Sequence, residues 1–151
     1  MLFRSDVSEW FEQYVDSPYM LLVAHVKEAK RRAMTVEEDA LFGIEKLNVP
    51  RSSVPAITHV DYSARIQTVH ADTSPRYHAV ISKFKEMTGC PIVVNTSFNV
   101  RGEPIVCTPK DAYKCFMGTQ LDVLAIGNYV LYKEQQDQSL IENYEARYEL
   151  D

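Results

Sequence analysis

Residues 95–106 gather the side chains best suited to bind a phosphorylated ligand. The segment reads N-T-S-F-N-V-R-G-E-P-I-V and follows the apolar run Pro91–Val94, which predicts a short buried strand. Ser97, Asn99 and Arg101 alternate along it, so an extended backbone would present all three on one side. A guanidinium can contact phosphate through two donors, while a hydroxyl and an amide bind the remaining oxygens. The pattern predicts a loop that stabilises charge during phosphoryl or adenylyl transfer.

Asn95 and Thr96 extend this candidate site by one more amide and one more hydroxyl. The alternative is an ordinary structural role, in which the asparagines and the serine form turns and Arg101 pairs with Glu103. The segment offers no obvious base or nucleophile, so its chemistry would depend on hydrogen bonds and charge.

A second polar cluster lies in the sequence H-V-D-Y-S-A-R at 59–65. In a straight strand, alternation would place His59, Asp61, Ser63 and Arg65 on one face. Four polar groups on one face predict the wall of a binding site. A solvent-exposed sheet face would show the same pattern, and the residues do not decide between the two.

Composition excludes several classes of protein. The length of 151 residues fits one domain, and the net charge of −5 with a pI near 5.4 argues against nucleic-acid binding. Cys90, Cys107 and Cys115 form no C-x-x-C pair, so we expect no metal site and a reducing compartment. No signal-like or membrane-spanning run is present, which predicts a cytoplasmic protein without membrane contact.

Helical and strand patterns alternate along the chain, which predicts an α/β or α+β fold around a twisted mixed sheet. The expected helices are residues 6–15, residues 74–89, which have Pro75 at the first helical position and end at Gly89, and residues 108–118, which open with a capping box of Thr108 and Asp111. The expected strands are residues 20–26, covered on both faces, and residues 56–60, 65–69, 91–94, 121–126 and 129–133, the last two joined by a turn at Gly127-Asn128. The second helix should bury Tyr77, Val80, Ile81, Phe84 and Met87. Residues 27–53 are charged and predict an insertion with one short helix near 36–42, and a terminal helix is expected around 140–148.

Three strings carry a resemblance to a known family: I-T-H-V-D at 57–61, S-A-R-I-Q-T-V at 63–69, and N-T-S-F-N-V-R-G-E-P-I-V-C-T-P-K-D-A at 95–112. Together they resemble the carboxyl-terminal domain of O-carbamoyltransferases, which include enzymes of nodulation-factor and antibiotic pathways. The similarity runs from about residue 6 to residue 133. It implies a YrdC-like domain over 1–133, with the insertion at 27–53 and a polar tail or helix over 134–151.

The resemblance also implies a reaction and the residues that support it. In the family, this domain combines carbamoyl phosphate with ATP, expected as its magnesium complex, to give carbamoyl adenylate and pyrophosphate. An amino-terminal ASKHA-type domain, which binds a metal, transfers the carbamoyl group to an acceptor hydroxyl. Ser97-Phe98-Asn99 matches the S-x-N element of the nucleotide site, and Arg65 and Arg101 are the cations carried over as catalytic ligands of phosphate and carbamoyl groups. Substrate contacts are expected from Asn95, Thr96, Ser97, Asn99, Ser63 and His59.

The sequence departs from the family before residue 6, where a basic segment is normally found and only Phe3-Arg4 stands. We therefore expect this chain to bind weakly and to catalyse little or nothing without further parts of the enzyme. The alternative is a YrdC-like module that has lost its chemistry and serves as a scaffold for a partner domain. Replacing Arg101 separates the two, because it should abolish ligand binding in an enzyme and leave docking intact in a scaffold.

Overall fold

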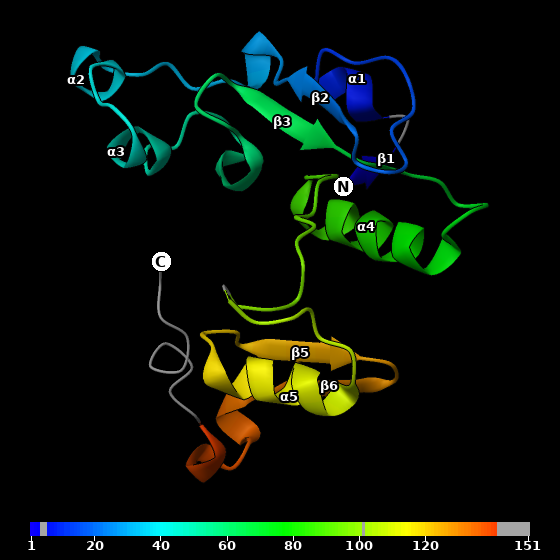
Figure 1. Cartoon of the computed structure of the whole chain (residues 1–151). Helices are drawn as coiled ribbons and strands as arrows, with labels where there is room; N and C mark the ends of the chain where they lie inside the picture. The colour runs from blue at the N-terminus through cyan, green and yellow to red at the C-terminus, as the bar shows by residue number, and fades with distance from the viewer. Residues whose placement is uncertain (4–5, 101, 142–151) are drawn as a thin grey trace. The chain divides into compact units, whose positions relative to one another are not determined.

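The computed structural model describes residues 1–3, 6–100 and 102–141, which form two compact units. Unit 1 comprises residues 1–95 and unit 2 starts at residue 96, and each is described by itself (Figure 1). Helices and strands occur in both units, which confirms the predicted mixed α/β class. Arg101 and residues 142–148 of the expected terminal helix lie outside the described residues. No helix in the described part of the chain is both long enough and apolar enough to span a membrane.

The strands that the structure describes in unit 1 form two separate ladders. Strand β1 (Leu2–Phe3) pairs in parallel with β4 (Thr68–Val69). Strand β2 (Leu22–His25) pairs antiparallel with β3 (Ser63–Ile66), so that His25 lies opposite Ser63 and Val23 lies opposite Arg65. Ala24 is the buried residue of β2, so the expectation that this strand is covered on both faces is wrong.

Several short helices interrupt unit 1, and one long helix follows them. The short ones are α1 (Val7–Trp10), the 3-10 helix η2 (Glu28–Lys30), α2 (Val36–Asp39), α3 (Ile44–Leu47) and the 3-10 helix η3 (Pro55–Ile57). The long helix is α4 (Pro75–Thr88), which Gly89 ends with a left-handed φ of 75°, as predicted. Of its expected apolar stripe only Ile81 is buried, whereas Val80 and Met87 are 58% and 75% exposed.

Residues 27–53 leave the β2–β3 ladder and return to it, and we call them the excursion. The helices α2 and α3 lie together at its far end (Figure 1). Two backbone hydrogen bonds close its base: Arg32 N–H donates to Arg51 O at 2.8 Å, and Ser53 N–H donates to Lys30 O at 2.9 Å. We call these paired residues, 30–32 and 51–53, the stem. The predicted insertion thus folds back on itself with two short α-helices and the 3-10 helix η2 rather than with one helix.

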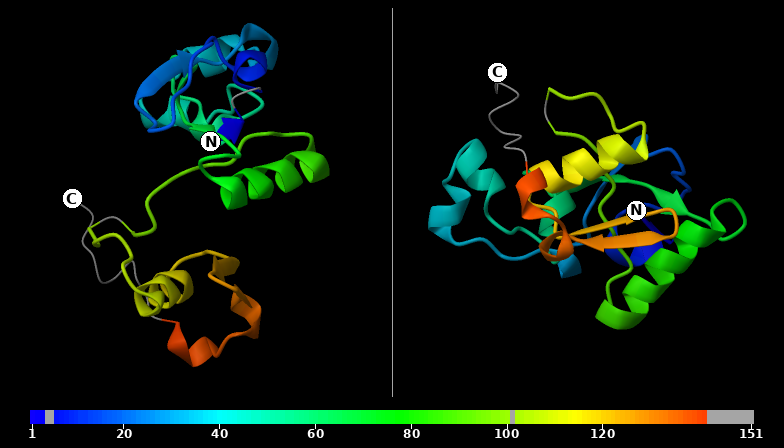
Figure 2. Two further views of the ribbon diagram at one scale, coloured as in Figure 1. Left: turned by 90° about the vertical axis from the view of Figure 1, so that its right-hand side faces the viewer. Right: turned by 90° about the horizontal axis from the view of Figure 1, so that it is seen from below.

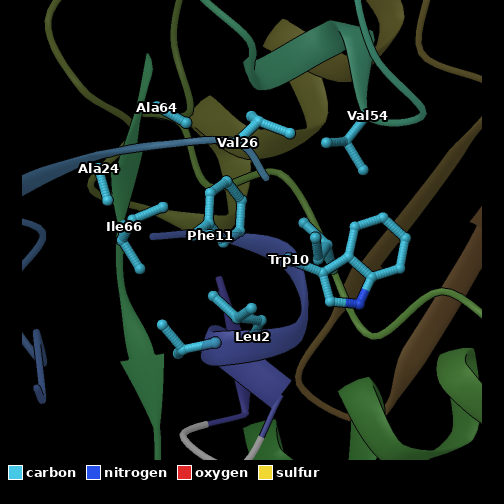
Figure 3. Close-up of a cluster of buried hydrophobic side chains, with 10 residues drawn as sticks. Leu2, Trp10, Phe11, Ala24, Val26, Val54, Ala64 and Ile66 are labelled. Atoms are coloured by element: carbon cyan, nitrogen blue, oxygen red, sulfur yellow. The ribbon is translucent and has the colours of Figure 1, made fainter. Parts of the chain in front are cut away.

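The main core of unit 1 lies between α1 and the β2–β3 ladder. Phe11, Val26 and Ile66 are fully buried there, with Leu2 and Trp10 beside them (Figure 3). Phe11 also forms an isolated antiparallel bridge with Val26, which explains why the helix predicted over 6–15 ends at Trp10. Tertiary pairing of the backbone here prevails over the helical pattern of the sequence.

The described residues of unit 2 place one α-helix on a two-stranded antiparallel sheet. Helix α5 (Pro109–Gly118) packs on β5 (Val123–Ile126), which pairs with β6 (Tyr129–Tyr132) (Figure 2). The buried residues of this small core are Ala112, Phe116, Met117 and Leu124. Two 3-10 helices follow, η4 (Lys133–Gln135) and η5 (Gln138–Leu140). Gly127 turns the hairpin with φ of 58°, as its Gly-Asn sequence predicts.

Thr108 and Asp111 form the predicted capping box of α5. Thr108 Oγ1 accepts from Asp111 N–H at 3.2 Å, and Asp111 Oδ2 accepts from Thr108 N–H at 3.0 Å. The Thr108 side chain and then nearby backbone N–H groups hold the pKa of Asp111 below its ordinary value. A depressed pKa stabilises the folded state above the ordinary pKa, and this contribution is lost as the pH falls through the folded-state pKa.

Replacing Thr108 with alanine is expected to destabilise unit 2 by about 1 kcal/mol, because one helix N–H loses its acceptor. Urea unfolding of the full chain, followed by circular dichroism at neutral pH, measures the loss. The acid-dependent loss of stability below about pH 4 should be smaller in Thr108→Ala than in the wild-type protein. Equal unfolding midpoints at neutral pH would contradict a stabilising capping box. Thr73→Ala, at an exposed threonine before α4, is the matched control.

Two predicted strands are wrong. Residues 56–60 contain the end of η3, because Pro55 starts a helical turn there and the Thr58 hydroxyl donates to Val54 O at 2.8 Å. Residues 91–94 form no strand among the described residues, although Val93 N–H donates to Met1 O at 3.0 Å. An apolar β-branched run needs a neighbouring strand, and the run itself does not show whether one is available.

Candidate functional site

The segment from His59 to Ser63 folds as a tight turn and not as a straight strand. Tyr62 N–H donates to His59 O at 3.0 Å, and His59 N–H donates to Ser63 O at 2.8 Å. Tyr62 takes a positive φ of 63°, which reverses the chain before β3 begins. The single polar face predicted over 59–65 is therefore wrong in its geometry, but the turn brings three of its four polar residues together.

The side chains of the turn bond to one another. His59 Nδ1 lies 2.9 Å from Ser63 Oγ, and Asp61 Oδ1 accepts from Ser63 N–H at 2.9 Å. The Ser63 hydroxyl and then its backbone N–H hold the pKa of Asp61 below its ordinary value, and His25 adds a smaller electrostatic contribution. Since Ser63 is buried whereas His59 and Asp61 are exposed, the imidazole and the carboxylate are the accessible parts of this cluster.

His25 also belongs to this cluster, although no motif in its sequence neighbourhood singles it out. It lies opposite Ser63 in the β2–β3 ladder and acts electrostatically on Asp61. Only the strand register brings it there. A prediction that residues 20–26 pair antiparallel with residues 63–69 would have placed His25 opposite Ser63.

Arg65 and Asn95 meet the same residue of unit 1, Met20. Arg65 Nη2 donates to Met20 O at 3.2 Å, and Asn95 Nδ2 lies 3.7 Å from Met20 Sδ. Asn95 Nδ2 also donates to Gln67 Oε1 at 2.9 Å. Arg65 is exposed between the buried neighbours Ala64 and Ile66, so its guanidinium points away from the core. Two predicted site residues thus lie on one exposed part of unit 1.

A cavity of about 490 Å³ lies beside β4 and the start of α4 in unit 1. Gln67, the partner of Asn95, is among the residues that line it, together with Thr68, His70 and Tyr77. None of the predicted site residues that the structure describes is among its lining residues. The cavity is therefore a neighbour of the Arg65 and Asn95 surface and not its centre.

In unit 2, Asn99 holds a closed loop together. Its Nδ2 donates to Glu103 O at 2.8 Å and to Val100 O at 3.1 Å. The loop is also closed by Glu103 N–H, which donates to Val100 O at 3.1 Å, and Gly102 takes a φ of 84° in the turn. Because both partners of Nδ2 are carbonyl groups that can only accept, the orientation of the amide is fixed.

The other amide atom of Asn99, Oδ1, is buried and has no hydrogen-bond partner among the described residues. A buried acceptor without a donor costs free energy, so such atoms are rare in folded proteins. Ser97 and Thr96 precede this loop and are exposed. Arg101 lies outside the described residues, so its predicted role stays a prediction.

The described residues contain no group of three or more histidine, cysteine, aspartate or glutamate side chains placed to hold a metal ion. The residues of the candidate site are instead hydroxyls, amides, an imidazole and a guanidinium. Such groups bind anions and polar ligands by hydrogen bonds and charge.

Comparison with known proteins shows similarity over most of the chain, including the three sequence strings at 57–61, 63–69 and 95–112. The family model described as Carbamoyltransferase C-terminus matches residues 1–133. An uncharacterized protein of Synechocystis is 56% identical over 146 residues, which cover 96% of this chain and 24% of that protein. The nodulation protein NolO of Bradyrhizobium diazoefficiens is 39% identical over 133 residues, which cover 86% of this chain and 21% of NolO.

A relative with a stated reaction is the 3'-hydroxymethylcephem-O-carbamoyltransferase of Amycolatopsis lactamdurans. It is 31% identical over 101 residues, which cover 67% of this chain and 15% of that protein. The chain spans about a quarter or less of the length of each of these relatives.

Proposed function

Since the chain belongs to the carbamoyltransferase C-terminus family, we propose that it activates a carbamoyl group for transfer to a hydroxyl. In this reaction, carbamoyl phosphate and magnesium-bound ATP give carbamoyl adenylate. A separate N-terminal ASKHA-type domain then transfers the carbamoyl group to its acceptor. The name of the Amycolatopsis relative states transfer of a carbamoyl group to oxygen by that protein, which supports this class of reaction.

The atoms of the proposed reaction balance with two phosphorus-containing by-products. Water cleaves carbamoyl phosphate to carbamate and inorganic phosphate. A carbamate oxygen then attacks the α-phosphorus of ATP, and the bond to the β-phosphate breaks to release pyrophosphate. Negative charge passes between phosphate oxygens in both steps, so fixed hydrogen-bond donors and cations are the groups that a protein needs to supply.

The observation that carries this proposal is the buried Oδ1 of Asn99, which has no donor in the part of the chain that the structure describes. Phosphate oxygens cannot donate to it, whereas the amino group of a carbamoyl moiety or of adenine can. A ligand bound at this loop could thus supply a donor to this buried acceptor. Its place in the S-x-N element agrees with the role that the family resemblance implies.

Arg65 and His59 are the groups of unit 1 that we assign to the same reaction. Arg65 uses one N–H on Met20 O, which leaves other N–H groups of its guanidinium for an anion. The Nδ1 of His59 is engaged by Ser63, so Nε2 is the ring atom that would contact a ligand. Ser63 then acts by orienting the ring, and Asn95 contributes an amide beside Arg65.

The test is a calorimetric titration of the chain with carbamoyl phosphate and, separately, with ATP and Mg²⁺. Weak binding of both is expected in the wild-type protein, and Ser97→Ala should weaken it about tenfold further, because a hydrogen bond to a charged ligand contributes roughly 1.5 kcal/mol or more. Ser82→Ala, at an exposed serine of α4, is the matched control and should bind like the wild type. Because Ser97 is exposed, its loss should not change the unfolding temperature.

Heat from neither ligand would contradict ligand binding by this chain and favour the scaffold role. Equal affinities of Ser97→Ala and the wild type would remove Ser97 from the site. Arg101→Ala adds the comparison that separates an enzyme from a scaffold. It should abolish ligand binding in an enzyme and leave partner docking intact in a scaffold.

A further inference from the structure

Arg51 is a buried cation whose bonds connect the excursion with the turn that carries His59. Its side chain is among the most buried of the polar residues, at 2% exposure. Its guanidinium donates to four backbone carbonyls, those of His59 at 3.2 Å, Thr58 at 2.9 Å, Val49 at 3.0 Å and Lys46. No carboxylate is among these partners. A buried charge is tolerated at such a position only when its donors are satisfied.

These four carbonyls come from two separate parts of unit 1. Lys46 and Val49 lie at and just after the end of α3, where helix carbonyls lack partners within the helix. A cation is favoured at a helix C-terminus for the same reason. Thr58 and His59 instead begin the turn that leads into β3. Arg51 therefore joins the outer part of the excursion to this turn through one rigid, planar group.

The bond to His59 also acts on the turn itself. His59 O accepts from Arg51 Nε and from Tyr62 N–H, and the second of these bonds closes the turn. The neighbouring side chains reinforce the same segment, since Ser52 Oγ and Thr58 Oγ1 lie 2.7 Å apart. The His59 carbonyl that closes the turn thus accepts one bond from the excursion, through Arg51, and one from within the turn, through Tyr62.

We propose that Arg51 is a positioning residue, which sets the geometry of His59 and Ser63 and makes it depend on the folded excursion. It does not contact substrate. Its effect on ligand binding rests on the proposed function, whereas its effect on the turn does not. The proposal predicts that loss of the guanidinium fork or of α3 loosens the turn locally without unfolding unit 1.

The first test measures amide hydrogen exchange by NMR on the full chain. In Arg51→Lys the charge is kept, but three donors on one atom cannot span carbonyls on two segments as a planar fork does. The amides of His59 and Tyr62 should exchange about fivefold to tenfold faster relative to the amides of β2. The ¹⁵N signal of His59 Nδ1, which reports its contact with Ser63, should shift as well. Carbamoyl phosphate should bind several-fold more weakly.

Ile81→Ala serves as the control for a purely structural effect. Ile81 is fully buried in a separate cluster with Val69, so its loss destabilises unit 1 without touching the turn. In that variant the exchange of the turn relative to β2 should stay unchanged. An unchanged ratio in a folded Arg51→Lys protein would overturn the proposal.

A second variant keeps Arg51 and disrupts α3, whose C-terminal end supplies carbonyl acceptors to the guanidinium. Leu47→Pro deletes the N–H that donates to Gly43 O at 3.3 Å and breaks α3, while Leu47 itself is more than half exposed. We expect faster exchange of Tyr62 N–H here too. Val36→Pro is the matched control, because proline is tolerated at the first position of a helix and the preceding Thr35 is extended. If Leu47→Pro left the turn unchanged, the proposed dependence on the excursion would be refuted.

If the wild-type chain bound neither ligand, the proposed function would fail, and the exchange data would still decide the role of Arg51.

Discussion

Arg65→Ala is expected to weaken the binding of carbamoyl phosphate by about tenfold to a hundredfold. The side chain is exposed on β3 and uses one N–H on Met20 O, so its other donors can bind an anion. Charge-assisted hydrogen bonds contribute about 1.5–3 kcal/mol, and each 1.4 kcal/mol corresponds to a factor of about ten in affinity. Calorimetric titration of the full chain measures the change. The prediction, like the proposed function, presumes that a ligand binds at this surface.

Two comparisons make the Arg65 result specific. Arg65→Lys keeps the charge but loses the planar fork, so it should fall between the wild type and Arg65→Ala. Arg76→Ala removes the same charge from an exposed position on α4 and should leave the affinity unchanged. Equal losses for Arg65→Ala and Arg76→Ala would show that net charge, and not a site at Arg65, governs binding.

Phe11→Ala is expected to cost about 3–5 kcal/mol of folding free energy, because it leaves a cavity where a fully buried aromatic ring was. Phe11 lies among Val26, Ile66 and Leu2 in the main core (Figure 3). Single domains have a total stability of only about 5–15 kcal/mol, so much of the stability of unit 1 would be lost. Urea unfolding followed by the fluorescence of Trp10, which lies in the same cluster, measures it.

Phe42→Ala is the matched control for Phe11→Ala. It removes the same ring from a position that is 91% exposed, so the free energy of unfolding should change by no more than about 0.5 kcal/mol. A similar cost at both positions would contradict the location of the core described above.

Elements with strong local signals were predicted from sequence. Helix α4 begins at its proline and ends at Gly89, α5 begins at its capping box, and β5 and β6 meet at Gly127, as expected. In each case, residues within a few positions satisfy or restrict the backbone, so the signal is local. The segments that failed, 56–60 and 91–94, depend on whether a distant strand is available, which composition does not show.

The same difference between local and long-range signals applies to the candidate site. The polar loop at 95–106 and the cluster at 59–65 stand out by side-chain type alone and stay predictions as sites, but their geometry follows from single backbone torsions. Tyr62 at positive φ turns a predicted strand face into a turn. Arg51 and His25 were missed because they reach His59 and Ser63 through long-range packing and strand register. Neither leaves a periodic pattern in the sequence.

The stem of the excursion has a consequence for how the chain can vary in length. Because residues 30–32 and 51–53 already bring its two ends together, extra residues at the tip would enlarge a loop that is closed at its base. The entropy of loop closure rises only with the logarithm of loop size, by roughly 0.6 kcal/mol for each doubling. The segment between Ala40 and Gly43, which carries the exposed Phe42, is therefore a place where insertions or a short tag can be accommodated while the turn at His59 keeps its support.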